Sequence, residues 1–213
     1  MLLLGAVAPN STVLDVGCAR GYLGCYLRQH KQARVWGIEP YAQAAADALA
    51  SGGYEQVVVA PVESALVSPE LAGKQFDVIL LADVLEHLSS PDMVLNTLTT
   101  YTGSNGMIVV SLPNVAHYSV RLSLLFGKWT MRDSGIMDRT HLHFYTQKTM
   151  RNLLEQHGWS IDRMQPRGDI ERWFERLGFG WLGRVILSWF PGWWAVQFVL
   201  VARRDTARDH SRI

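Results

Sequence analysis

Apolar runs alternate along this chain with segments that have the composition and periodicity of helices. The apolar runs predict strands over 13–16, 35–39, 56–60, 76–82, 106–112, 159–164 and 195–203. Helices are predicted from Tyr22 onward and over 42–50, 91–101 and 146–157. Strands that alternate with helices in this order are typical of an α/β fold, in which a mostly parallel sheet carries helices on both faces.

Length, charge and cysteine content narrow the class of protein. A chain of 213 residues suits one domain, predicted over 1–204, with a solvated tail at 205–213. The net charge of +1 argues against a nucleic-acid partner. Cys18 and Cys25 make no disulfide framework and indicate a reducing, cytoplasmic location. The apolar start Met1–Leu4 lacks a basic region, so no signal peptide is expected.

The first predicted strand runs into a glycine loop of the form Asp-x-Gly-x-Ala-x-Gly, which begins at Asp15. Such a loop lets backbone N–H groups and a helix N-terminus approach a ligand closely. A dinucleotide fingerprint would need glycine at 17, 19 and 22, but Ala19 and Tyr22 break it. About 20 residues on, the second strand ends in Glu39, whose carboxylate can accept hydrogen bonds from ribose hydroxyls. These features predict a nucleotide-like cofactor across the first two strands.

Three further motif-like segments follow the glycine loop along the chain, at 81–88, 111–117 and 138–146. Together the four resemble class I S-adenosylmethionine (SAM) methyltransferases, in the branch similar to ubiquinone-biosynthesis O-methyltransferases and glycosyltransferase-associated methyltransferases. The resemblance implies a Rossmann-like sheet with strand order 3-2-1-4-5-7-6 and strand 7 antiparallel. SAM would lie across the carboxyl ends of strands 1 and 2.

The same resemblance implies roles for individual residues. The loop would surround the methionine part of SAM, the strand-2 acid would hold the ribose with the following proline against the adenine, and the end of strand 4 would approach the transferring methyl. The cofactor-binding residues implied in this way are Asp15, Gly17, Cys18, Ala19, Gly21, Glu39, Pro40, Val62, Glu63, Ala82 and Asp83.

Two features depart from the family pattern. After strand 3 the family commonly has Gly-Asp, whose carboxylate binds the adenine amino group, whereas this chain has Ala60-Pro61. The backbone N–H of Val62 and the carboxylate of Glu63 are expected to replace that acid. The family also carries helices ahead of strand 1, where this chain has only Met1–Pro9.

Histidines supply the candidate catalytic groups, because His87, His117 and His141 all fall on the predicted cofactor side. His141 is the first choice for a general base toward a hydroxyl acceptor. The alternative is that these imidazoles only pin the loops by hydrogen bonds. Asp83-x-x-Glu86-His87 also resembles a metal-binding pattern of related methyltransferases, but the pattern is common without metal, and no metal is predicted.

The segment 167–194 is a predicted helical insert between strands 6 and 7 and holds five of the eight tryptophans. Residues 185–202 carry no charge, but Pro191-Gly192 divides them, so no spanning helix is expected. The segment could form a lid over the acceptor, a homodimer surface or a peripheral membrane contact. Packing against the domain's own sheet is the ordinary alternative.

These observations predict a cytoplasmic SAM-dependent methyltransferase that methylates oxygen on a small molecule or a sugar-containing envelope precursor. Methylation of nitrogen or carbon is the alternative among enzymes. A non-catalytic SAM-binding partner or regulatory module of a glycosyltransferase is the alternative from another class.

Overall fold

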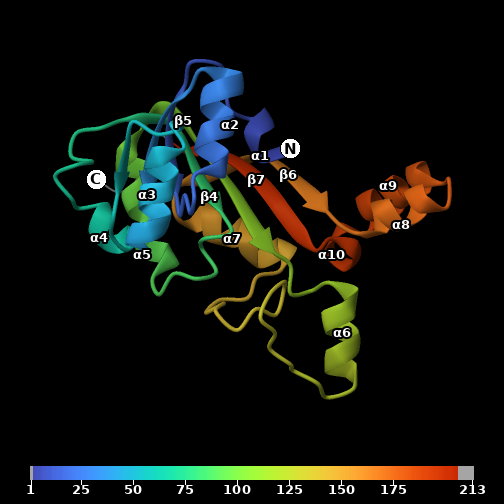
Figure 1. Cartoon of the computed structure of the whole chain (residues 1–213). Coiled ribbons are helices and arrows are strands. Elements are labelled where there is room, and N and C mark those ends of the chain that lie inside the picture. The colour runs from blue at the N-terminus through green and yellow to red at the C-terminus, as the bar shows by residue number, and fades with distance from the viewer. Residues whose placement is uncertain (1, 206–213) are drawn as a thin grey trace.

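The computed structural model describes residues 2–205, and a seven-stranded sheet forms its centre (Figure 1). The strands are β1 (Thr12–Val16), β2 (Arg34–Ile38), β3 (Gln56–Val58), β4 (Phe76–Ala82), β5 (Thr102–Pro113), β6 (Trp159–Arg167) and β7 (Gln197–Arg204). Their order across the sheet is β3-β2-β1-β4-β5-β7-β6, with β7 antiparallel to both of its neighbours. The predicted topology is therefore confirmed.

Helices cover both faces of the sheet. They are α1 (Leu2–Gly5), α2 (Tyr22–Lys31), α3 (Ala42–Ala50), α4 (Val62–Ala65), α5 (Pro91–Leu98), which continues into the 3₁₀ turn η1 (Thr99–Tyr101), α6 (Tyr118–Leu125), α7 (Gln147–Gln156), α8 (Ile170–Arg176), α9 (Gly180–Trp189) and α10 (Pro191–Trp194). Because successive strand residues point to opposite faces, β1 divides its side chains between two cores. Leu14 and Val16 pack in the core that contains Leu95 of α5, while Val13 packs in the core that contains Leu27 of α2.

β5 begins four residues earlier than the apolar run at 106–112 predicts. Phe76 of β4 pairs with Thr102, but the next pair joins Val78 to Met107, so the register shifts in between. Extra residues on one strand of a pair form a bulge. A Cβ on Gly106 would lie 2.4 Å from Cβ of Thr102, so this fold-back needs glycine.

The segment between β6 and β7 forms α8, α9 and α10, and Figure 1 shows α8 and α9 standing clear of the sheet. Within residues 2–205, none of the helices combines the length and apolarity needed to cross a bilayer. Of the tail predicted at 205–213, only Asp205 belongs to the described part, and its backbone N–H donates to the carbonyl of Gly158.

Candidate functional site

The glycine loop makes a tight turn from β1 into α2. Gly17 and Gly21 have φ of +71° and +87°, in the left-handed region that favours glycine. A Cβ on Gly21 would lie 2.7 Å from Cα of Ala48, so α3 approaches the loop closely. The backbone N–H groups of Gly17 and Cys18 both donate to the carbonyl of Ile38 at the end of β2. The loop is therefore fixed against the second strand.

Glu39 connects this loop to the residues that follow β2. Its side chain is only 5% exposed. One carboxylate oxygen accepts the backbone N–H of Ala19 at 2.9 Å, and the other accepts that of Tyr41 at 3.0 Å. Each oxygen has a second lone pair. Glu39 therefore closes the loop and retains acceptor capacity for a pair of hydroxyl groups.

Asp15 lies buried in β1 beneath the loop. Its Oδ2 accepts the hydroxyl of Tyr54 at 2.6 Å, and the Tyr54 oxygen accepts the backbone N–H of Gly24 at 3.0 Å. Burial, with a smaller contribution from Glu39, raises the pKa of Asp15 to about 7. Among the described residues Oδ1 has no hydrogen-bond partner. An orphaned buried carboxyl oxygen beside a glycine loop fits a cationic ligand such as the methionine part of SAM.

The residues predicted to meet the adenine lie beyond β2 and β3. Pro40 is exposed, and Val62 is the first residue of α4, directly after Pro61. Glu63 accepts a hydrogen bond from the Ser89 hydroxyl at 3.2 Å, which joins α4 to the segment before α5. The adenine roles of Pro40, Val62 and Glu63 stay predictions.

Asp83 follows Ala82 at the carboxyl end of β4 and has a φ of +56°. Its carboxylate accepts the Ser111 hydroxyl from β5 at 2.9 Å and the Gln197 amide from β7 at 2.5 Å. The ends of three strands therefore meet at one side chain. Spacing along the sequence gave no sign of Ser111 or Gln197, because these contacts depend on strand order.

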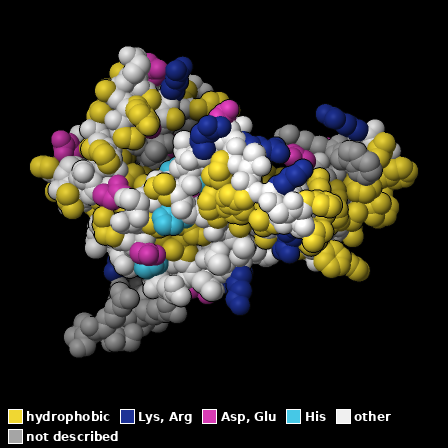
Figure 2. Space-filling view, turned by 90° about the horizontal axis from the view of Figure 1, so that it is seen from below, with side chains coloured by type: hydrophobic (Ala, Val, Ile, Leu, Met, Phe, Trp, Pro, Cys, Tyr) yellow, Lys and Arg dark blue, Asp and Glu magenta, His cyan; other side chains and the backbone are white. Residues whose placement is uncertain are grey.

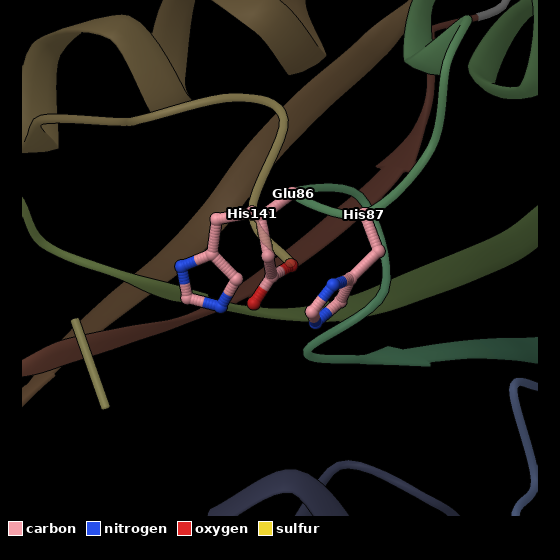
Figure 3. A group of neighbouring side chains, drawn as sticks. All are labelled: Glu86, His87 and His141. Carbon is pink, nitrogen blue, oxygen red and sulfur yellow. The ribbon is translucent and has the colours of Figure 1, made fainter. Parts of the chain in front are cut away.

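A cluster of Glu86, His87 and His141 lies at the same edge of the sheet. Figure 3 shows the three side chains extending side by side from the loop after β4 and from the loop before α7. One ligand atom of each lies within 4.8 Å of those of the other two. Nδ1 of His87 is 3.2 Å from the Thr140 carbonyl, and Nδ1 of His141 is 3.2 Å from the Ile136 carbonyl. Since a carbonyl only accepts, each Nδ1 carries the proton and each Nε2 keeps a lone pair when the ring is neutral.

Burial sets the protonation of this cluster. Glu86 is 1% exposed, and neither of its carboxyl oxygens has a hydrogen-bond partner among the described residues. Burial raises the pKa of Glu86 to about 8. Burial also lowers the pKa of His141, an effect that the hydrogen bond to Ile136 partly opposes. Near neutral pH the cluster therefore combines a protonated carboxyl with a neutral imidazole.

The cluster also has the donor set of a metal site. Two imidazole nitrogens and a carboxylate suit a divalent cation. Metal-ligating histidines usually donate their other ring N–H to a carbonyl or carboxylate, as His87 and His141 do here. The sequence pattern singled out Asp83, Glu86 and His87, whereas the structure groups Glu86 and His87 with His141. The expectation of no metal stays a prediction.

The loop that carries His141 is also held through its backbone. The N–H groups of Leu142 and His143 donate to the carbonyl of Glu86 at 2.8 and 3.1 Å. These bonds fix residues 141–143 against the loop after β4 without using either imidazole. The imidazoles of His87 and His141 contribute to holding the loop only through Nδ1, so each Nε2 keeps its lone pair.

His117 lies in different surroundings. It is the N-cap of α6, where its Nδ1 accepts the backbone N–H of Ser119. It lines a cavity of about 490 Å³ together with Tyr118, Asp169 and Trp194. Burial lowers its pKa, while Asp169 opposes that shift. Because capping engages Nδ1, His117 is less suited than His141 to accept a proton, and its catalytic role stays a prediction.

The strand order, the glycine loop and the buried acid after β2 define a class I SAM-dependent methyltransferase domain. Residues 2–164 match the family described as methyltransferase domain, and the chain belongs to that family. S-adenosylmethionine is the cofactor of this class, and the residues around Asp15 and Glu39 fit it.

Two curated relatives are ubiquinone biosynthesis O-methyltransferases. The mitochondrial protein of Mus musculus is 23% identical over 188 residues, covering 83% of this chain and 50% of that protein. The protein of Colwellia psychrerythraea is 30% identical over 155 residues, covering 68% and 59%. The chain thus spans about half to three-fifths of their length. A TehB-like SAM-dependent methyltransferase from Corynebacterium glutamicum shares the fold, with a TM-score of 0.58, 15% identity, and coverage of 95% of this chain and 85% of that one.

Proposed function

We propose that this protein transfers the methyl group of SAM to a hydroxyl oxygen of a small-molecule acceptor. The observation that carries the proposal is the neutral His141 imidazole at the carboxyl edge of the sheet, whose Nε2 is left as a proton acceptor. The names of the two curated relatives support oxygen as the atom that is methylated.

The chain's own residues divide the work between holding the donor and preparing the acceptor. SAM, when bound, supplies an electrophilic methyl group on a sulfonium. Glu39 has the acceptor capacity to hold the ribose hydroxyls, and the unpaired oxygen of Asp15 faces no competing protein donor among the described residues. An acceptor hydroxyl placed against His141 would lose its proton to Nε2, which makes the oxygen a better nucleophile.

A second arrangement at the same cluster is favoured by the unpaired oxygens of Glu86. With Glu86 ionised, Glu86, His87 and His141 would hold a divalent cation through one carboxylate and two Nε2 atoms. Such an ion would polarise the acceptor oxygen and replace the base. Both arrangements use His141, but only the second needs a metal.

We propose the class of methyl acceptor less specifically than the type of reaction. A saccharide hydroxyl on an envelope precursor fits the same base, whereas transfer to nitrogen would need less help from His141. The free Cys18 and Cys25 support a cytoplasmic location.

Titration calorimetry with SAM and S-adenosylhomocysteine tests the cofactor half of the proposal. Glu39→Ala is expected to weaken SAM binding by about 2 kcal/mol or more, at least roughly 30-fold, because two ribose hydrogen bonds to a charged acceptor are lost together with the bonds that close the loop. Glu70→Ala, which removes an exposed acid outside the site, is the matched control. A protein that ignores SAM and binds NAD would contradict the assignment.

Conversion of SAM to S-adenosylhomocysteine tests the activity. We expect turnover with phenolic or saccharide hydroxyl acceptors and little with amines of the same shape. A protein that binds SAM tightly but gives no turnover with these acceptors or with a cell extract would favour the non-catalytic module.

A further inference from the structure

The segment between β6 and β7 exposes an unusual number of large apolar side chains. We call residues 170–194, which form α8, α9 and α10, the aromatic arm. Trp189 is 75% exposed and Trp181 is 59% exposed. The other large exposed apolar residues of the arm include Leu177, Phe179, Phe190 and Trp193. Figure 2 shows hydrophobic side chains gathered over this projecting part of the molecule.

The sequence of α9 explains why one helix is apolar on two faces. Gly183 and Leu187 are buried and attach the helix to the rest of the molecule. Trp181, Val185 and Trp189 follow one another at spacings of four, so they lie along one face, and all three are exposed. A surface helix that packs only on its own domain places polar residues on that outer face. The outer face of α9 therefore has the composition of a surface that is covered by an apolar partner outside its own domain.

The outer face also continues into a hollow without polar lining. Val185, Ile186 and Trp189 from α9 and Phe190 and Trp193 beyond it line a cavity of about 470 Å³. The guanidinium of Arg121 in α6 lies 4.8 Å from the centre of the Trp193 ring. Apolar surface and basic groups thus occur together at this end of the molecule.

Basic residues also outnumber acidic residues in and beside the aromatic arm. Residues 167–194 hold four Arg against three Asp and Glu, and Arg121 of α6, beside Trp193, adds a fifth basic group, whereas the whole chain holds 20 Lys and Arg and 19 Asp and Glu. The exposed Arg176 and Arg184 lie on the arm itself, where Glu175 is 3.7 Å from Arg184. Figure 2 shows Lys and Arg side chains bordering the hydrophobic surface. The rest of the chain is net acidic.

We propose that the aromatic arm binds the surface of an anionic lipid bilayer. Tryptophan suits this role because its ring is apolar and its N–H is polar, so it settles at the boundary between acyl chains and headgroups. Arginines beside it are attracted to anionic headgroups, and helices that combine the two lie in the plane of the interface. A second copy of the chain would cover the apolar face as well, but it would bring the same excess of basic residues.

Co-sedimentation with vesicles tests the proposal on the whole chain. We expect binding to vesicles of phosphatidylcholine and phosphatidylglycerol in a 7:3 ratio, and at least tenfold weaker binding to phosphatidylcholine alone. Raising the salt concentration to 0.5 M should weaken binding to the anionic vesicles several-fold, because screening reduces the contribution of the arginines.

A pair of double variants locates the surface. Trp181→Glu with Trp189→Glu should lower the vesicle partition coefficient at least tenfold. Leu49→Glu with Val67→Glu makes the same change of charge at exposed apolar residues elsewhere and should bind less than threefold more weakly than wild type. Circular dichroism and SAM binding serve to verify that both proteins are folded.

The outcomes that overturn the proposal are distinct. Absence of binding to anionic vesicles, with a dimer in analytical ultracentrifugation that the Trp181 and Trp189 changes dissociate, assigns the face to a second copy. Equal loss of binding in both double variants means that net charge, not the arm, controls the association. Neither result bears on the methyltransferase activity.

Discussion

Two histidines at the carboxyl edge of the sheet are held so that each presents the same ring nitrogen. Backbone carbonyls of Thr140 and Ile136 accept from Nδ1 of His87 and His141, so each Nε2 keeps a lone pair that can receive a proton. The two differ in exposure, since His87 is exposed and His141 is half-buried. Burial lowers the pKa of His141, which favours its neutral imidazole.

His141→Ala should reduce turnover about 10²–10⁴-fold, because that is the usual contribution of a general base. SAM affinity should stay within about twofold of wild type, since the residues assigned to the cofactor lie on the glycine loop and after β2. His30→Ala, at the exposed end of α2, is the matched control. Turnover that is only halved would contradict the assignment of His141 as the base.

Metal removal separates the two arrangements at this cluster. A base mechanism predicts that turnover is unchanged by EDTA and that His87→Ala is much milder than His141→Ala. A metal-assisted mechanism predicts loss with EDTA, recovery with added divalent cation, and loss of bound metal in both variants. Metal content by mass spectrometry reads out the difference without relying on activity.

Individual site residues differed in how far the sequence could predict them. Asp15 and Glu39 were predicted because a glycine loop and a strand-end acid are local patterns, and the structure places both at one edge of the sheet, while their cofactor roles stay predictions. Tyr54 and Gln197 were not found, since each meets its partner carboxylate only through tertiary packing. Only part of the Glu86 cluster could be recognised from sequence spacing. Glu86 and His87 are adjacent, whereas His141 lies 55 positions after Glu86.

At the scale of elements, the turn between β1 and α2 depends on close approach as well as on backbone freedom. Gly21 combines a φ of +87° with a neighbouring helix whose backbone would lie 2.7 Å from an added Cβ. Gly52, after α3, has a φ of +72° but nothing within 4 Å of an added Cβ. A side chain at Gly52 would therefore add backbone strain alone, whereas one at Gly21 would add both backbone strain and a steric clash with α3.

Gly21→Ala should lower the free energy of unfolding by about 2 kcal/mol more than Gly52→Ala, because both add strain of about 1–2 kcal/mol and only the first displaces α3. Urea denaturation followed by circular dichroism measures both. Ala19, at a φ of +47°, offers the opposite change, and Ala19→Gly should be neutral or stabilising by up to about 1 kcal/mol. Equal losses for the two glycine variants would show that the approach of α3 is unimportant.

All seven strands were predicted, because buried strands of a parallel sheet read as nearly continuous apolar runs. The short helices α1 and α4 were missed, since four residues are too few to show a helical period. α6 was missed for a different reason: its apolar residues Leu122, Leu124 and Leu125 are exposed and do not form one stripe. Strand order came from family resemblance, because periodicity does not specify which strands pair.

At the scale of the whole molecule, the burial of Asp15 makes the free energy of unfolding depend on pH. The pKa of Asp15 is raised from its ordinary value of 3.8 to about 7 in the folded protein, chiefly because burial disfavours the charged carboxylate. Between these values the folded state binds a proton that the unfolded state has lost. Stability from this group is therefore fully present below about pH 4 and is lost as the pH rises to about 7.

Asp15→Asn removes this contribution, because the amide does not ionise and its oxygen can still accept the Tyr54 hydroxyl. Without SAM, the free energy of unfolding of wild type relative to Asp15→Asn should fall between pH 4 and 7 and stay level above. One pKa unit corresponds to about 1.4 kcal/mol, so the fall should not exceed about 5 kcal/mol. Asp133→Asn, at an exposed ion pair with Arg139, should give a curve parallel to wild type. Urea titrations at each pH measure the difference in unfolding free energy between wild type and variant. The contribution of Glu86 is the same in both proteins and cancels. If the curves of wild type and Asp15→Asn ran parallel with pH, the raised pKa of Asp15 would be refuted.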